Sequence, residues 1–297
     1  MKVCTIVVSY NFEKWLHTCL SSLRNSALKS TVLVIDNASS DNTCKIITDN
    51  YPEVVLLQNH ENLGFGKANN IGMRYALDNN FDYVFLLNQD AWVELDTIEK
   101  LIEASYKNPE FGIISPIHLN GSGEKFDFGF SNYTGLKSKE DAMNLSETIT
   151  SCNFINAAAW LIPVSVVKKT GGFAPIFPHY GEDVNYSQRV KNQKLKIGFV
   201  KNTFAYHDRE FRVINREKFF YSEYIYFLTE AVNPLYSPLK AFAYSVPAAM
   251  KKSLISLFSG KFNDSLRYVK IAFQITGKAR SIRETRKVSK SQNGPFL

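Results

Sequence analysis

The sequence predicts an α/β protein with a mostly parallel sheet and flanking helices, followed by a helical C-terminal region. Short apolar runs alternate with segments of helical periodicity over the first half of the chain. Strands that alternate with helices form right-handed crossovers onto a mostly parallel sheet. After Asp208 the strand signals stop and the chain becomes helical and aromatic. We therefore expect an α/β domain over residues 1–208 and a helical, basic, aromatic-rich region over residues 209–297.

The first half of the chain carries four predicted strands, each followed by a predicted helix. A continuous apolar run is typical of a strand that is buried on both faces, and such runs lie at Val3–Ser9, Thr31–Ile35, Val54–Leu57 and Tyr83–Leu87. Apolar residues on one helical stripe predict helices at Glu13–Arg24, Ser40–Asn50, Gly66–Asn79 and Asp96–Tyr106. Small polar side chains favour the N-cap position, so we expect Ser39 or Ser40 to cap the second helix and Asp96 to cap the fourth.

The middle of the chain is less regular. Gly121–Gly135 is rich in glycine, serine and aromatic residues, which predicts a hairpin or a loop insertion. The segments expected after it are an apolar stretch at Phe154–Ile162, short helices at Val164–Lys169 and Asp183–Asn192, and a strand at Lys196–Val200.

The charge of the chain is unevenly distributed. From Met1 to Asp208, 19 Lys and Arg residues face 22 Asp and Glu residues, whereas from Arg209 to Leu297 the numbers are 16 and 6. The C-terminal third is therefore expected to face an anionic partner. Its aromatic residues interleave with Leu, Ile and Ala at helical spacing, which favours packing or a membrane interface over the stacking of nucleic-acid bases. We expect no nucleic-acid partner.

The basic C-terminal third also suggests where the protein works. Tyr and Phe residues between Phe219 and Phe258 could sit at a lipid headgroup interface, and the basic residues that could meet anionic lipid are Lys251, Lys252, Lys261, Arg267 and Lys270. The alternative is that the aromatic residues pack against the rest of the chain or a second subunit, which leaves a homo-oligomer open.

The sequence predicts neither a membrane-spanning helix nor an export signal. No run reaches the roughly 18 apolar residues that a membrane span needs, and the apolar run in MKVCTIVVSYN is too short for a signal peptide. Scattered cysteines predict reduced, buried thiols, and these are Cys4, Cys19, Cys44 and Cys152. We expect a cytoplasmic protein, soluble or peripheral on the inner face of the cell membrane.

Polar residues follow three of the predicted strands, at the edge where an open parallel sheet binds its ligand. These clusters are Ser9-Tyr10-Asn11, Asp36-Asn37 and Asn88-Gln89-Asp90. Asp36 and Asp90 could be turn formers, since Asp is common in turns. Alternatively, Asp36 could accept a hydrogen bond from the N3–H of a pyrimidine base, and Asp90 could bind Mg²⁺ or Mn²⁺ beside a diphosphate.

Three further sites carry both a structural and a functional interpretation. The loop from Asn62 to Lys67 contains a GxG that could present N–H groups to a phosphate at a helix N-terminus, or it could be a tight turn; Asn69 replaces the third glycine of a dinucleotide fingerprint. Glu182-Asp183 could interact with a helix dipole or supply a general base. His207 could be a structural hydrogen-bonding residue or, with Asp90, a metal ligand.

These segments together resemble the family 2 glycosyltransferases of the GT-A fold, particularly the bacterial rhamnosyltransferase-like branch. The matching pieces occur in family order over residues 3 to 207, and they read TIVVSYN, VLVIDNASSDNT, ENLGFGKANNIGMRYA, YVFLLNQDA, NAAAWLIPVSVVKKTGGF, YGEDVNYSQRVKNQKLKIGFV and AYH. Two features depart from the family pattern. Asn88 stands at the first acidic position of the DxD-type motif, and the residues DREF follow His207 without the expected small or serine-containing pattern.

The resemblance implies a role for each candidate residue. Asp90 would be the metal-binding acid, Asp183 the catalytic base of the ED motif, and His207 a further metal or diphosphate contact. Asp36 would hold the donor base. The residues implied to bind or lie near the donor are Ser9, Tyr10, Asn11, Asp36, Asn62, Lys67, Asn88, Gln89 and Asp90.

The implied activity is metal-dependent, inverting transfer of a sugar from a nucleotide diphosphate sugar, dTDP-rhamnose or a UDP-hexose, onto a saccharide hydroxyl in cell-surface glycan assembly. The acceptor could be lipid-linked. Two other functions stay open. A nucleotide-sugar nucleotidyltransferase should carry a Gly-rich signature with a basic residue near its N-terminus, which SYNFEKW does not match. A catalytically silent glycosyltransferase-like module would not need both Asp90 and Asp183.

Overall fold

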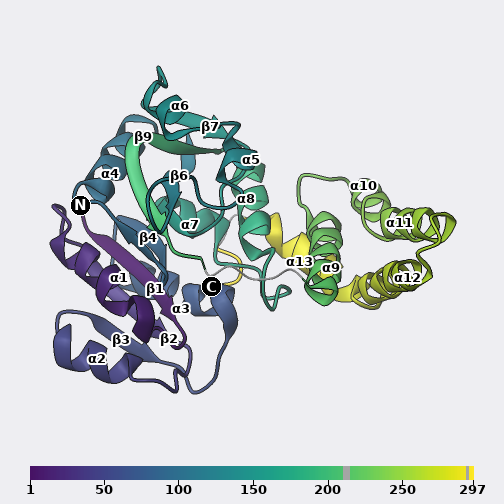
Figure 1. The fold of residues 1–297 in the computed structure, drawn as a ribbon, viewed down its shortest axis with the longest axis horizontal. Coiled ribbons are helices and arrows are strands. Elements are labelled where there is room, and N and C mark those ends of the chain that lie inside the picture. The colour runs from purple at the N-terminus through teal and green to yellow at the C-terminus, as the bar shows by residue number, and fades with distance from the viewer. Residues whose placement is uncertain (210–214, 292–293) are drawn as a thin grey trace.

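The structure is a computed structural model that describes residues 1–209, 215–291 and 294–297. Within these residues a nine-stranded sheet has the order β3-β2-β1-β4-β8-β6-β9-β5, with β7 paired to β9, and helices cover both of its faces (Figure 1). The strands are β1 (Val3–Ser9), β2 (Thr31–Asp36), β3 (Val55–Gln58), β4 (Tyr83–Asn88), β5 (Ala91–Val93), β6 (Phe111–Asn120), β7 (Ile149–Cys152), β8 (Ala159–Pro163) and β9 (Lys196–His207).

Helices α1 to α8 belong to the α/β part, and helices α9 to α13 follow after residue 209. In the α/β part they are α1 (Glu13–Asn25), α2 (Thr43–Asn50), α3 (Gly64–Asp78), α4 (Thr97–Lys107), α5 (Phe130–Thr134), α6 (Lys139–Met143), α7 (Val164–Thr170) and α8 (Glu182–Asn192). The C-terminal helices are α9 (Arg216–Val232), α10 (Pro238–Ala243), α11 (Val246–Phe258), α12 (Phe262–Gly277) and α13 (Ala279–Ser289).

The first four strands form the parallel part of the sheet, as the sequence predicts. β1 lies between β2 and β4, with Ser9 opposite Asp36 and Val8 opposite Asn88. β3 continues the parallel ladder beyond β2. The carboxyl ends of β1, β2 and β4 therefore meet at one edge, which brings the three polar clusters together.

The rest of the sheet is mixed, so the parallel part is smaller than expected. Half of the eight strand pairings are antiparallel, namely β4–β8, β6–β8, β7–β9 and β5–β9. An apolar run does not reveal strand direction, because a strand buried on both faces has the same pattern in either orientation. β9 also continues to His207, past the predicted end at Val200, and pairs along its second half with β6 and β5.

One predicted helix cap is wrong, and a second has the predicted position without the cap hydrogen bond. α2 begins at Thr43 and its N-cap residue is Asn42, because Ser39 and Ser40 take part in the loop after β2, where they contact Asp36 and Asn11. Asp96 does occupy the N-cap position of α4, but its side chain makes no cap hydrogen bond; it pairs with Lys100 instead, at 2.7 Å. The segment 121–135 forms a turn, a bridge from Leu119 to Phe126 and the short helix α5.

The core has one apolar layer on each face of the sheet. Val7 points into the layer that α1, α2 and α4 complete, and Ile6 points into the layer that α3, α7 and α8 complete. Cys4 and Cys19 are buried as expected, whereas Cys44 and Cys152 are only half-buried, and all four are free thiols. Because successive residues of β1 reach both layers, β1 holds the centre of the fold.

The C-terminal helices extend from the α/β part, and α11 and α12 form a hairpin at the far end of the molecule (Figure 1). α9 packs on α8 and on α12. The chain then returns to the sheet, where the N–H of Gly172 donates to the carbonyl oxygen of Pro295 at 2.9 Å and Asn70 Nδ2 donates to that of Phe296 at 3.1 Å. The boundary near residue 208 remains a prediction. Among the described residues, no helix is long and apolar enough to cross a membrane.

Gly72 tests the packing of α3 on β1. A Cβ atom at this position would lie 2.7–2.9 Å from three side-chain atoms of Ile6, a residue that is fully buried. We expect Gly72→Ala to lower the free energy of unfolding by about 1–2 kcal/mol, because overpacking outweighs the gain in helix propensity. Urea unfolding measures this change. Gly277→Ala in α12 is the matched control, since nothing lies within 4 Å of its Cβ. Equal effects of the two substitutions would contradict the packing argument.

Candidate active site

Asp36 lies at the end of β2 and is already held by neighbouring hydroxyl and amide groups. Its Oδ1 accepts from Ser9 Oγ at 2.8 Å and from Ser39 Oγ at 2.5 Å, and its Oδ2 accepts from the N–H of Ser39 at 2.9 Å. The side chain is 2% exposed. Asp36 therefore anchors the loop after β2, which is the structural interpretation; its contact with a donor base stays a prediction.

The loops after β1 and β2 hold each other in place. The side-chain oxygen of Asn11 accepts from the N–H of Ser40 at 2.9 Å, and the N–H of Asn11 donates to Ser39 Oγ at 2.9 Å. Asn11 and Ala38 both adopt left-handed backbone conformations, with φ of 50° and 62°. Such conformations cost free energy in residues other than glycine and cluster at functional sites.

The third cluster divides into two roles. Gln89 bridges to the loop after β1, because its Oε1 accepts from the N–H of Tyr10 at 2.8 Å and its Nε2 donates to the carbonyl oxygen of Tyr10 at 3.3 Å. Asn88 instead places its Nδ2 3.3 Å from His207 Nε2. Gln89 thus joins the loop after β4 to the loop after β1, and Asn88 belongs to the group of side chains around His207.

His207 is brought to Asp90 by the pairing of β5 with β9. Ala91 lies opposite His207 in this antiparallel pair, so the residue before Ala91 reaches the end of β9. His207 Nε2 is 3.1 Å from Asp90 Oδ1, and His207 Nδ1 is 3.0 Å from Asp127 Oδ2. His207 is therefore held between two carboxylates, as its predicted association with Asp90 requires.

The carboxylate of Asp127 favours a proton on Nδ1 of His207. A carboxylate oxygen can only accept, so Nδ1 must donate to Asp127. Arg209 Nε lies 3.2 Å from Asp127 Oδ1 and completes the contacts of that buried carboxylate. Burial alone would lower the pKa of His207, but hydrogen bonds and charge attraction from Asp127 and Asp90 raise it overall. The raised pKa favours a second proton on Nε2, which faces Asp90 Oδ1.

Sequence reasoning missed Asp127 and Arg209. Asp127 lies between two phenylalanines in the irregular 121–135 segment, and it is 80 positions from His207 in the chain, so no local pattern pairs them. Arg209 was visible only as a departure from the family pattern. Burial raises the pKa of Asp127, but His207 and Arg209 lower it overall and keep it ionised.

Asp183 stands in the first turn of α8. Two left-handed residues precede this helix, Tyr180 with φ of 64° and Gly181 with φ of 86°, and they turn the chain so that Asp183 is partly exposed. Its Oδ1 accepts from the N–H of Val184 at 2.8 Å. Burial raises the pKa of Asp183, and N–H groups of Val184 and Ala157 offset part of the rise.

Glu182 points the other way and is buried. Its side chain packs over the first turn of α3, near Gly66, and among the described residues its Oε2 has no hydrogen-bond partner. Burial and the neighbouring Asp183 raise the pKa of Glu182 to about 8. A protonated Glu182 leaves one negative charge in the pair, on Asp183.

Asp183 shares its surroundings with the His207 cluster. The charge of Arg209 acts on both Asp183 and Asp127, and the pKa of the Tyr133 phenol is raised mainly by burial and also by Asp183 and Asp127. The start of α8 therefore lies within reach of the charges at Asp127 and Arg209, and a shared site of Asp90, His207 and Asp183 stays a prediction.

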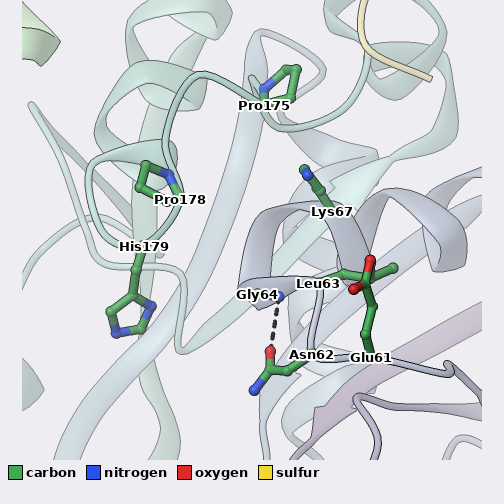
Figure 2. A pocket seen from close by; sticks show the side chains of 8 residues that line it. All are labelled: Glu61, Asn62, Leu63, Gly64, Lys67, Pro175, Pro178 and His179. Carbon is green, nitrogen blue, oxygen red and sulfur yellow. Dashed lines mark hydrogen bonds between the residues drawn. The ribbon is translucent and has the colours of Figure 1, made fainter.

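A cleft of about 540 Å³ lies beside this edge. Glu61, Asn62, Leu63, Gly64 and Lys67 form one wall, and the loop with Pro175, Pro178 and His179 forms the other (Figure 2). Asn62 Oδ1 accepts from the N–H of Gly64 at 2.9 Å, which supports a turn at the start of α3. Asn37 Nδ2 reaches the carbonyl oxygen of Gly64 at 3.4 Å, so the cleft adjoins the end of β2. Its volume suits a small-molecule ligand.

The architecture is that of α/β proteins that bind ligands at the carboxyl edge of the sheet, and comparisons with known proteins identify the family. The model of Glycosyl transferase family 2 matches residues 4–171. The chain belongs to this family, and its fold is the GT-A fold.

Two curated relatives illustrate the likeness in sequence. The low-salt glycan biosynthesis hexosyltransferase Agl10 of Haloferax volcanii is 22% identical over 69% of this chain and 66% of its own length. The N-acetylglucosaminyl-diphospho-decaprenol L-rhamnosyltransferase of Mycobacterium tuberculosis is 24% identical over 62% of this chain and 69% of its own length. The match thus spans about two thirds of each relative.

Solved structures share the fold. S. aureus TarS 1–349 in complex with UDP has a TM-score of 0.57 and 16% identity, over 98% of this chain and 90% of that one. GalNAc-T7 with UDP, GalNAc and Mn²⁺ has a TM-score of 0.60 and 14% identity, over 88% of this chain and 58% of that one. At these identities the likeness establishes the fold and leaves the roles of individual residues to other tests.

The raised pKa of Glu182 gives a pH-dependent prediction. Between its ordinary pKa of 4.5 and about 8, the folded protein keeps a proton that the unfolded chain loses, so native Glu182 becomes increasingly destabilising as pH rises. We expect the stability of Glu182→Gln relative to wild type to increase from about pH 5 to about pH 8.

Urea midpoints at the two pH values measure this effect. Glu53→Gln is the control, because Arg24 lowers the pKa of the exposed Glu53. The effect of Glu53 on the free energy of unfolding therefore does not grow over the same pH range. A Glu182→Gln difference that stays constant or shrinks with pH would show that Glu182 is ionised in the folded state.

Proposed function

We propose that the protein is a metal-dependent, inverting glycosyltransferase that moves a sugar from a nucleotide diphosphate sugar onto a saccharide hydroxyl in cell-surface glycan assembly. The observation that carries the proposal is the contact of His207 with Asp90 and Asp127 at the carboxyl edge of the sheet, together with Asp183, which the charge of Arg209 also reaches. One part of this site can hold a cation beside a diphosphate, and the other presents a carboxylate to an acceptor.

The donor occupies the edge formed by β1, β2 and the β3–α3 loop. Asp36 and Asn11 fix the loops on which the base would lie, and Lys67 lines the adjoining cleft, where its charge can attract a phosphate. A pyrimidine nucleotide is supported by the solved structures of TarS with UDP and with UDP-GlcNAc. A rhamnose donor is supported by the name of the mycobacterial relative, so dTDP-rhamnose and UDP-hexoses are the donors to test.

The residues around His207 fit Mg²⁺ or Mn²⁺. Asp90 supplies carboxylate oxygen, the ligand type that both ions prefer. His207 donates through Nδ1 to Asp127, so Nε2, once it has lost its proton, can bind a cation beside Asp90. A hydrogen bond from the other ring nitrogen orients many metal-bound histidines in this way. Among the residues described, no three His, Cys, Asp or Glu side chains gather in a metal-binding group. This suits a cation that takes its remaining ligands from a diphosphate and water.

Asp183 acts as the general base. Asp183 is a half-buried residue, and its raised pKa makes its carboxylate a better proton acceptor. It accepts the proton of the acceptor hydroxyl as the oxygen attacks the anomeric carbon. Asp90 and His207 would hold a cation, which would supply positive charge to balance the departing diphosphate.

The acceptor is a saccharide, and a lipid-linked acceptor is supported by the name of the mycobacterial relative, a diphospho-decaprenol rhamnosyltransferase. A catalytically silent module is disfavoured because Asp183 has both exposure and a raised pKa, which a purely structural helix-start residue does not need. Membership of the glycosyltransferase family likewise disfavours a nucleotidyltransferase.

Asp183→Asn tests the base. We expect turnover to fall by about 10²–10⁴-fold, because an amide cannot accept the hydroxyl proton, whereas binding of UDP or dTDP should be nearly unchanged. Product formation with a panel of nucleotide sugars measures the first effect and calorimetry measures the second. Glu182→Gln is the matched control, since it changes the neighbouring carboxyl and leaves Asp183 in place. A variant that keeps more than about a tenth of the wild-type rate would remove Asp183 from this role.

Mn²⁺ binding tests the metal site. We expect nucleotide diphosphate to bind more tightly with Mn²⁺ than with chelator, and Asp90→Asn to abolish that difference. Asp127→Asn should weaken Mn²⁺ by about 10–100-fold, because His207 loses the partner that orients it.

The metal test also has a pH arm. Mn²⁺ affinity should increase with pH through the raised pKa of His207, since the cation replaces the proton on Nε2. Asp141→Asn is a control carboxylate, at the N-terminus of α6. The metal site would be refuted if wild type and Asp90→Asn bound nucleotide equally well with and without Mn²⁺.

A further inference from the structure

The hairpin of α11 and α12 turns large apolar side chains to the solvent. Phe258 is 87% exposed, Phe262 65% and Phe273 73%. The helices of a globular protein normally bury their apolar stripe and expose polar residues. The hairpin face is the set of exposed apolar residues Met250, Leu254, Leu257, Phe258, Phe262, Leu266 and Phe273.

These residues lie on one side of the hairpin, away from α9. In α11, Lys252 pairs with Glu223 of α9, whereas Ser253 faces α12, where its Oγ is 2.9 Å from Ser265 Oγ. With 3.6 residues per turn, Met250, Leu254 and Leu257 then point away from α9.

The same geometry holds for α12. Tyr268 Oη donates to Glu223 of α9 at 2.9 Å, which places the side of α12 near Tyr268 against α9. Leu266 and Phe273 lie on the opposite side by helical spacing. The apolar stripes of both helices are therefore adjacent and form one continuous surface, closed at the hairpin tip by Phe258 and Phe262.

The charged residues at this surface are positive. Lys251, Lys261 and Lys270 are exposed beside the hairpin face. Asp264 is the one acidic residue between Val246 and Gly277, and it pairs with Arg216. The two other basic residues of the hairpin face inward, since Lys252 bonds to Glu223 and Arg267 lies 5.1 Å over the ring of Phe220.

Two aromatic residues of α9 have the packing role that was the alternative to a headgroup interface. Phe220 and Phe227 are buried in a cluster with residues of α12 and α13, so this part of the aromatic segment packs the helices together. The surface available to an outside partner lies further along the chain, in α11 and α12.

We propose that the hairpin face docks on an anionic lipid bilayer, with its apolar side chains at the acyl boundary and Lys251, Lys261 and Lys270 on the headgroups. An apolar stripe rimmed by lysines is the pattern of helices that lie in a membrane interface. A second copy fits less well, because a twofold contact pairs the same patch of both copies and would bring their lysines together.

The docked hairpin is joined to the candidate active site through α9. Tyr221 of α9 donates from Oη to the carbonyl oxygen of His179 at 2.9 Å, and a Cβ on Gly181 would lie 2.7 Å from Ile225 of α9. The loop that leads to Asp183 therefore rests on the helix that supports the hairpin. The membrane proposal does not depend on the transfer reaction, and its test reads binding alone.

Sedimentation of the full chain with vesicles tests the proposal. We expect binding to vesicles of phosphatidylglycerol with phosphatidylcholine, little binding to phosphatidylcholine alone, and weaker binding at high salt. The triple variant Lys251→Glu, Lys261→Glu, Lys270→Glu should lose on the order of 100-fold in affinity. Wild type should keep some vesicle binding at high salt through its apolar residues. The variant Leu254→Ser, Phe258→Ser, Phe273→Ser should lose this salt-resistant binding.

Matched controls separate docking from general adsorption. Lys168→Glu, Lys169→Glu, Lys194→Glu changes the net charge equally on the α/β part, and Leu95→Ser with Tyr106→Ser removes exposed apolar side chains there; both should bind vesicles like wild type. Thermal unfolding confirms that each variant is folded.

Three results would overturn the proposal. The first is wild-type protein that stays in the supernatant with phosphatidylglycerol vesicles at low salt. The second is a control lysine variant that loses as much affinity as the hairpin variant. The third is wild type that sediments as a dimer, ignores vesicles and becomes monomeric when the hairpin face is made polar, since this would assign the face to a second copy.

Discussion

The antiparallel pairing of β5 with β9 is the constraint on which the candidate site depends. It sets Ala91 opposite His207, and the N–H of Asp208 donates to the carbonyl oxygen of Asp90 at 2.8 Å. Two segments that are more than a hundred positions apart in the chain thus meet with fixed register. Because side chains alternate along a strand, a slip of one residue would turn His207 away from Asp90. The backbone ladder, more than any side-chain contact, determines that the two residues face each other.

The local part of the fold could be predicted from the sequence, and the long-range part could not. Apolar runs located β1 to β4 to within one or two residues, and the parallel alternation placed Ser9, Asp36 and Asn88 at one edge. Strand direction in the second half has no local signature, so the mixed character of the sheet was missed. Ser39 and Ser40 looked like helix caps, but the neighbouring loop from β1 offered them Asp36 and Asn11 as partners. Tertiary hydrogen bonds outweighed the local preference.

The candidate site could likewise be predicted only in part from the sequence. Ordered motifs made Asp90, Asp183 and His207 candidates, yet Asp127, which contacts His207, lies in a segment without periodicity. Nothing in KFDFGF indicates a carboxylate that is buried beside a histidine 80 positions away. Residues that support a site through other residues are constrained by shape and charge, and a single sequence records these constraints poorly. Glu182 is the opposite case. Its motif suggested a catalytic role, whereas its burial suggests that the carboxyl group stays neutral.

The return of residues 294–297 to the sheet has a consequence for the order of folding. Pro295 packs so closely on Gly171 that a Cβ on Gly171 would meet the Pro295 carbonyl oxygen at 1.8 Å, and Leu297 joins the apolar layer that α3, α7 and α8 complete. These contacts join segments that the C-terminal helices separate along the chain. The α/β part therefore completes its surface only after those helices have been synthesised, although every strand of the sheet precedes them.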